Sequence, residues 1–144
     1  MTWQRTRIDV PENLSAKDRI RLADKVIDYI IQRTENGSGM KNGRKFRFPK
    51  YSKEYTQSLD FKIAGKKKGK VDLKLSGDML AAIELLSHRK GSLLVGFENN
   101  TEENDKAEGN QKGTYGQPSP LPGKARPFLD VNKSELSALI RELN

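Results

Sequence analysis

A chain of 144 residues suits one domain, which we expect to span 1–144. Its apolar fraction of 34% and charged fraction of 32% leave too little apolar surface for every segment to be packed. There is no apolar run of transmembrane length, no signal-peptide core and no cysteine, so we expect no membrane span, no secretion and no thiol chemistry.

The first third of the chain predicts one long helix after an extended lead-in over residues 1–14. Ser15, followed three positions later by Asp18, resembles a helix-start pair, with Asp where Glu or Gln is more usual. Apolar residues then recur every three or four positions to about Thr34. They are Ile20, Ala23, Val26, Ile27, Ile30 and Ile31. Gly37 and Gly39 are expected to end the helix.

Residues 36–70 form a basic, glycine-rich segment that we expect to be an arm or loop. Aromatic residues are interleaved with the basic ones: Phe46, Phe48, Tyr51, Tyr55 and Phe61. These rings either pack over the long helix as the lid of a small core, or form a groove for single-stranded nucleic acid. We favour the lid, because the spacing matches no RNA-binding motif. The lysines 66–68 (Lys66, Lys67 and Lys68) predict a solvated tip between two elements.

The stretch from 71 to 97 holds the densest apolar content, and we expect the core here. Alternating residues predict a strand over 71–75. Met79, Leu80 and Ile83 then share one face of a short helix of two or three turns. A polar bend ending in Gly91 separates two extended apolar runs, which indicates a hairpin.

Residues 98–124 are predicted to be a long flexible loop, rich in polar residues and proline. One or two helical turns over 103–111 are left open within it, although the segment has no clear periodicity. Large apolar residues return at 125–129, which we expect to dock on the core. Asn132 and Glu135 form a second helix-start pair. The final amphipathic helix carries Leu136, Leu139, Ile140 and Leu143.

The net charge of +8 is unevenly distributed. Residues 41–74 contain twelve Lys or Arg against three Asp or Glu, a local balance of +9, whereas 98–108 holds five acidic residues and only Lys106 opposing them. The basic region can bind nucleic acid, meet an acidic protein, or pair with the acidic segment of a neighbouring copy. It can also be no more than a solvated surface.

Catalysis finds little support in the sequence, and we predict no enzyme, no metal site and no cofactor. His88 is the single histidine and cannot build a metal site alone. The acidic segment lacks the alternation and closing glutamate of a helix–loop–helix calcium site. No GxxxxGK[ST] phosphate cradle is present.

The order of several short motifs resembles a known family. The motifs are GRKF at 43–46, LSGDML at 75–80, a hairpin with Val95-Gly96, and ARPFL at 125–129. Together with the N-terminal helix they span about 19–143, and ARPFL is the most specific of them. This order resembles the tail-completion proteins (neck, or virion-morphogenesis proteins) of tailed bacteriophages, which include the Mu-like virion-morphogenesis proteins. Residues 107–113, AEGNQKG, depart from the family pattern, and the basic run at 62–70 is heavier than expected.

The resemblance implies an α+β fold: a mixed or antiparallel sheet with a long N-terminal helix, a short central helix and a C-terminal helix. It also implies a structural virion protein at the head–tail junction, assembled in the host cytoplasm. It implies a ring of identical subunits, a hexamer or dodecamer, that joins the tail tube to the head connector. Partners would be tail terminator, tube or connector proteins, and contact with the DNA in the channel is left open. Candidate contact residues are Arg44, Lys45, Lys66, Lys67, Lys68, Glu102, Glu103, Asp105, Arg126 and Phe128. The alternative function is a small basic nucleic-acid-binding module.

Overall fold

The computed structural model describes residues 2–48, 78–98, 100–112 and 125–143, and it has the expected α+β fold. The elements in chain order are β1 (Arg5–Asp9), α1 (Ala16–Glu35), β2 (Ser38–Lys41), β3 (Arg44–Arg47), α4 (Asp78–Ala81), β4 (Glu84–Arg89), β5 (Ser92–Gly96), α5 (Thr101–Lys112) and α6 (Lys133–Arg141). None of the helices in these described ranges is long and apolar enough to cross a membrane.

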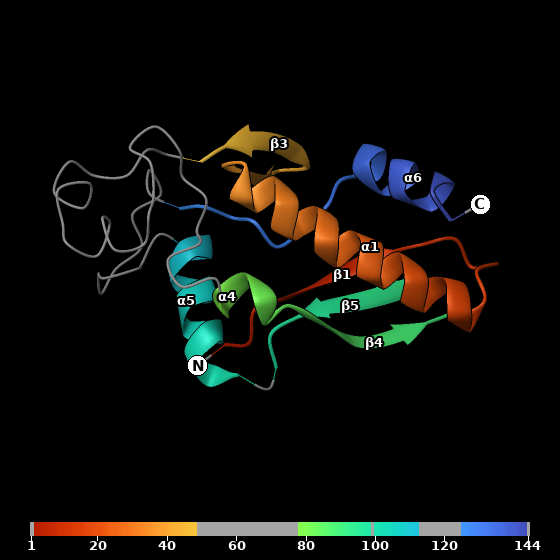
Figure 1. The fold of residues 1–144 in the computed structure, drawn as a ribbon, viewed down its shortest axis with the longest axis horizontal. Helices are drawn as coiled ribbons and strands as arrows, with labels where there is room; N and C mark the ends of the chain where they lie inside the picture. Colours follow the sequence, from red (N-terminus) through yellow and green to blue (C-terminus); the bar gives the residue numbers. More distant parts are fainter. Residues whose placement is uncertain (1, 49–77, 99, 113–124, 144) are drawn as a thin grey trace, which may run out of the picture.

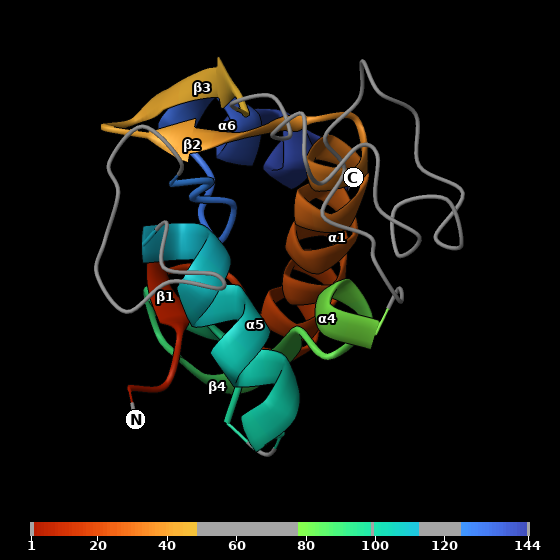
Figure 2. The ribbon, with the colours of Figure 1, turned by 90° about the vertical axis from the view of Figure 1, so that its left-hand side faces the viewer.

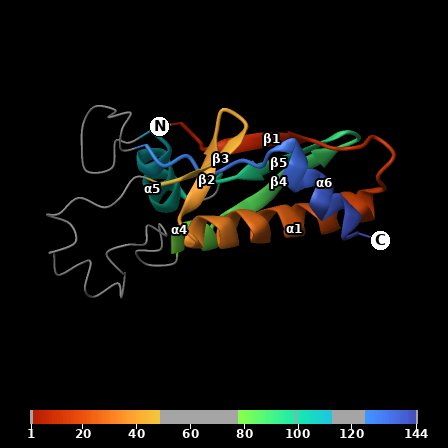
Figure 3. The same ribbon diagram turned by 90° about the horizontal axis from the view of Figure 1, so that it is seen from above.

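A three-stranded antiparallel sheet in the order β1-β5-β4 carries the long helix α1 along one face (Figure 3). The hairpin predicted around Gly91 is confirmed, with Arg89 opposite Ser92. The lead-in contains a strand that we did not predict: β1 pairs along β5 and places Ile8 opposite Leu93. Its alternation is weak because the strand is mostly exposed, and pairing with β5 supplies its backbone hydrogen bonds.

Helix α1 begins and ends as its sequence predicts. The Ser15 side chain accepts a hydrogen bond from the Asp18 backbone N–H at 3.1 Å, and Gly37 follows the C-cap with a φ of 89°. Gly39 does not end the helix, because it lies inside β2. A Cβ at Gly39 would come within 2.0 Å of the Pro127 carbonyl oxygen, so this glycine permits a close approach of two backbones.

Strands β2 and β3 form a second, two-stranded sheet within the segment expected to be an arm (Figure 2). Asn42 and Gly43 make the turn, both with positive φ, as two-residue hairpin turns require. Phe46 and Phe48 pack edge to face at 5.7 Å and join the core, in agreement with the lid interpretation for these two rings. The other three rings and the lysines 66–68 lie outside the described residues.

The central helix is shorter than predicted. Helix α4 has four residues, against the two or three turns that we expected. Met79, Leu80 and Ile83 are all buried as predicted. The chain leaves the helix after one turn because β4 begins at Glu84 and pairs with β5. The strand expected over 71–75 lies outside the described residues.

The prediction of a loop over the whole of 98–124 is wrong for 101–112, which forms the helix α5. Its buried side is polar or small and consists of Glu103, Asn104, Ala107 and Gly109, so the apolar periodicity that reveals a helix is absent. Hydrogen bonds take its place: the Asn104 carboxamide accepts from the Gln4 backbone N–H at 2.7 Å and donates to the Thr2 carbonyl at 3.0 Å.

The C-terminal segment returns to the core as predicted. Phe128 and Leu129 are buried, and Asn132 and Glu135 form a complete capping box at the start of α6. Leu139 of α6 is buried, and the helix packs beside α1 (Figure 1). The core therefore brings together residues from β1, α1, α4, β5 and the chain's end, and extends well beyond the stretch 71–97.

Candidate functional site

Arg33, near the end of α1, holds the returning C-terminal segment in place. One terminal nitrogen, Nη1, donates to the Glu135 carboxylate at 3.0 and 3.3 Å. The other, Nη2, donates to the backbone carbonyls of Phe128 and Asp130, both at 2.7 Å. The Arg33 side chain is 2% exposed and that of Glu135 10%, so this is a buried ion pair. Both terminal nitrogens of Arg33 are hydrogen-bonded, whereas its Nε is buried without a partner among the described residues.

Tyr29, one turn before Arg33, completes this cluster. Its hydroxyl donates to Glu135 Oε2 at 2.5 Å, and the guanidinium carbon of Arg33 lies 5.7 Å from its ring centre. Burial raises the pKa of Tyr29 from 10.0 to about 12; the hydrogen bond and the charge of Glu135 add to this effect, and Arg33 opposes it. The folded state therefore keeps the Tyr29 proton, and with it the hydrogen bond to Glu135, at pH values where an ordinary tyrosine would lose it.

The segment 125–129 is fixed from three further directions. The Gln111 side-chain carbonyl of α5 accepts hydrogen bonds from the backbone N–H groups of Phe128 and Leu129 at 2.7 and 3.1 Å. Met40 of β2 donates its backbone N–H to the Pro127 carbonyl at 3.0 Å. The Phe128 ring is fully buried and packs edge to face against Phe97 at 6.4 Å.

Two of the predicted contact residues are internal to the subunit rather than at its surface. Phe128 is 0% exposed because it fills the core between α1, β5 and α5. Glu103 is 5% exposed because it lies on the buried side of α5, where its carboxylate pairs with Lys106 at 2.9 Å. Arg126 is half-buried, and its backbone N–H donates to the Asn110 carbonyl at 2.6 Å. The folded subunit does not offer Phe128 or Glu103 to a partner.

The β2–β3 hairpin presents a basic surface, which we define as Lys41, Arg44, Lys45 and Arg47. All four side chains are exposed, and the described residues offer none of them a carboxylate within ion-pair distance. Residues 38–48 contain no acidic residue. The predicted contacts Arg44 and Lys45 therefore do lie at the surface, and the structure brings Lys41 and Arg47 together with them.

The acidic segment carries less free negative charge than its composition indicates. Glu102 and Asp105 are exposed in the first turns of α5, at the opposite edge of the subunit from the hairpin (Figures 1 and 2). Four of the five carboxylates of 98–108 lie within 4.0 Å of a cation of the same subunit. The pairs are Glu98–Arg5, Glu102–Lys106, Glu103–Lys106 and Glu108–Lys112. The five carboxylates of 98–108 and these three cations, Arg5, Lys106 and Lys112, together have a net charge of −2.

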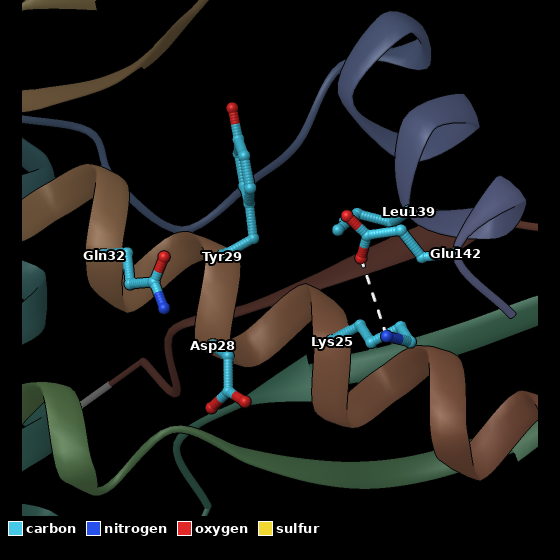
Figure 4. Close-up of a pocket in the computed structure, with 6 residues that line it drawn as sticks. All are labelled: Lys25, Asp28, Tyr29, Gln32, Leu139 and Glu142. Carbon is cyan, nitrogen blue, oxygen red and sulfur yellow. Dashed lines mark ion pairs between the residues drawn. The ribbon is translucent and has the colours of Figure 1, made fainter.

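A groove of about 250 Å³ lies between α1 and α6 (Figure 4). Its walls are Lys25, Asp28, Tyr29, Gln32, Leu139 and Glu142. Lys25 and Glu142 form an ion pair across it at 3.5 Å, while Asp28 and Tyr29 point away from one another. The residues that line the groove therefore do not form a nucleophile–base pair of the kind that catalysis requires.

His88 has a structural contact: its Nδ1 accepts a hydrogen bond from Arg19 Nε of α1 at 3.1 Å. In the described ranges, no group of three or more His, Cys, Asp or Glu side chains is placed to hold a metal ion. Sequence reasoning missed Arg33, although a signal exists. Arg33 follows Val26 by seven positions and Ile30 by three, which puts a charged residue on the buried stripe of the helix.

Comparisons of the chain with protein-family models, with curated protein sequences and with solved structures give no match. Its function must therefore be inferred from its own motifs, fold and surfaces.

Proposed function

We propose that this chain is a structural subunit of a tailed-phage virion, located at the junction of head and tail, where copies of it assemble into a ring. The resemblance of its motif order to tail-completion proteins is the source of this proposal. Its partners would be the tail terminator, tail tube or connector proteins. Its role would be to hold neighbouring components in register rather than to carry out a reaction.

The observation that carries the proposal is where the two most specific motifs lie. Met79 and Leu80 of LSGDML are 4% and 2% exposed, and Phe128 and Leu129 of ARPFL are 0% and 4% exposed. All four belong to the same core cluster. Motifs at core positions support a resemblance in fold, which is what unites structural proteins, and not a resemblance in a reactive site.

The folded subunit also limits how a ring could be built. A ring joins one surface of a subunit to a different surface of the next. We expected the basic region and the acidic segment to supply that pair of surfaces. The four ion pairs within the subunit weaken this expectation, because they leave the α5 surface with little charge to offer a neighbour. The proposal that the chain forms a ring is therefore supported by the resemblance and not by charge pairing between subunits.

The test is the mass of the purified chain in solution by light scattering, together with immunodetection of the chain in purified particles from an infected lysate. We expect either a ring, with a mass that is a multiple of 16.3 kDa, or a monomer present at fixed low copy in particles. A monomer that is absent from particles would overturn the proposal.

A small nucleic-acid-binding module is the second candidate, and the unbalanced charge of the β2–β3 hairpin favours it. This function predicts binding to DNA or RNA that weakens steeply with salt. Filter binding at two salt concentrations separates the two functions. If the protein retains no DNA or RNA on the filter at low salt, the chain is not a nucleic-acid-binding module.

A further inference from the structure

The β2–β3 hairpin carries cations on both of its faces. Lys41 lies opposite Arg44 in the register, so these two side chains share one face. Lys45 lies opposite Met40 and Arg47 opposite Ser38, and because side chains alternate along a strand, Lys45 and Arg47 share the other face. A flat acidic partner could contact only one face of this ribbon at a time. A groove with anions along both walls could contact both.

The described residues of the subunit do not balance this charge. The directly opposed pair of Lys41 and Arg44 places like charges side by side, which destabilises a strand pair. None of the four cations has a carboxylate partner in the described part of the chain. A bound polyanion would remove the repulsion, whereas the α5 carboxylates are mostly paired within their own subunit.

The hairpin is held in place on the subunit, so binding would require little ordering. Its turn adopts the positive φ angles that match the twist of the strands. The Asn132 side chain donates to the Gly43 carbonyl at 3.5 Å and ties the tip to the start of α6. The neighbouring residue Lys133 is exposed and adds a fifth cation beside the tip. Preorganised contacts retain more of their interaction energy as affinity.

We infer that the β2–β3 hairpin is a binding site for the phosphates of a nucleic-acid duplex. The major groove of B-DNA is about 12 Å wide and admits a two-stranded β-ribbon, with a phosphate backbone on each side. Two cations on each face of the ribbon match that arrangement, and two of the four are arginines, which suit phosphate recognition. The inference deepens the second candidate function, and it holds whether or not the chain forms a ring.

The test compares two variants with equal loss of charge. The double variant Arg44→Gln/Lys45→Gln changes the hairpin, and the control Lys17→Gln/Lys90→Gln removes two exposed cations elsewhere. Binding to a labelled 20-base-pair duplex of mixed sequence is measured by fluorescence anisotropy over a series of salt concentrations. We expect the hairpin variant to reduce the slope of log K against log salt by about 2, while the control leaves the slope unchanged.

Three outcomes would overturn the inference: no duplex binding by the wild-type chain at low salt, equal slopes for the wild type and the hairpin variant, or equal loss in both variants. If the hairpin variant changes the mass of the assembly and leaves the duplex slope intact, the hairpin contacts protein instead. Thermal unfolding of both variants verifies that each is folded. The copy number in particles tests the head–tail role separately, so the two proposals can fail independently.

Discussion

Arg33 and the cations of the β2–β3 hairpin lie within fifteen positions of one another, yet they carry their charge in opposite ways. Arg33 is 2% exposed at its side chain and is held by a carboxylate and two backbone carbonyls. The hairpin cations are exposed and have no carboxylate partner among the described residues. The positive charge of Arg33 holds the C-terminal segment on the core, whereas the positive charges of the hairpin lie at the surface.

The difference shows what a count of charges leaves out. A local balance of +9 over 41–74 treats every Lys and Arg alike, and it does not include Arg33. Burial decides the role: a buried cation that loses its partner costs several kcal/mol, whereas an exposed cation contributes little to stability. Each of the following predictions tests whether the two regions differ in this way.

The largest effect is expected for Arg33→Met. This change leaves Glu135 buried without its cation and removes the donor from two carbonyls. We expect the free energy of unfolding to fall by about 3–5 kcal/mol, measured by urea denaturation. The control Arg21→Met alters an exposed arginine of the same helix, which pairs with Asp18 and donates to the Leu143 carbonyl at 3.3 Å, and should cost less than about 1 kcal/mol. Equal losses in the two variants would contradict the role of Arg33 in holding the C-terminal segment in place.

Phe128→Ala tests the segment that Arg33 holds, and its expected effect is of similar size. The ring is fully buried against Phe97, so its removal leaves a cavity and should lower the free energy of unfolding by about 3–5 kcal/mol. Ile20→Ala, at a side chain 45% exposed, is the control and should change stability much less. Unchanged thermal unfolding of the Phe128 variant would instead put the ring at a partner surface.

Tyr29→Phe gives a smaller effect with a defined pH dependence. Loss of the hydrogen bond to Glu135 should cost about 0.5–1.5 kcal/mol at neutral pH. Because the folded pKa is raised to about 12 from 10.0, the folded state retains the Tyr29 proton over a range in which the unfolded chain loses it. This contribution is present in full below pH 10 and is lost as the pH rises toward 12.

The measurement is denaturant unfolding of the wild type and the Tyr29→Phe variant between pH 9 and pH 12. The wild type should lose stability over this range more steeply than the variant does. The effect of titrating the other tyrosines and lysines is common to both proteins and cancels in the comparison. Parallel curves would mean that Glu135 and burial do not hold the Tyr29 proton.

Elements defined by apolar periodicity or by caps could be predicted from the sequence. Helix α1, the hairpin around Gly91, the capping box of α6 and the docking of 125–129 all follow from such local signals. The full length of helix α5 could not be predicted, because its buried side contains Glu103 and Asn104 and is held by hydrogen bonds to residues 2–4, just before β1. Those bonds join residues about a hundred positions apart, and no local pattern reveals them.

The candidate contact residues were predicted less well, because charge was used without knowledge of burial. Arg44 and Lys45 lie at the surface, while Glu103 and Phe128 are internal. The hairpin turn could have been recognised from Asn42-Gly43, a dipeptide typical of two-residue turns between strands. The pairing of α5 carboxylates with Lys106 and Lys112 follows the spacing of three and four residues on a helix, but only once the helix itself is known.

The smallest effect on stability is expected for Arg44→Gln/Lys45→Gln, and this prediction is the sharpest test of the comparison. Both side chains are exposed and unpaired with any described carboxylate, so the free energy of unfolding should change by no more than about 0.5 kcal/mol. Relief of the repulsion between Lys41 and Arg44 would make the variant slightly more stable.

Gly43→Ala is the control that perturbs the same hairpin through its backbone rather than through its charge. Gly43 has a φ of 75°, which disfavours alanine by about 1–2 kcal/mol, although a Cβ there would meet no atom within 4 Å. Denaturant unfolding should therefore register the backbone change and not the loss of two charges. A loss above 1 kcal/mol in Arg44→Gln/Lys45→Gln would mean that the hairpin cations also hold the fold, and the distinction from Arg33 would no longer stand.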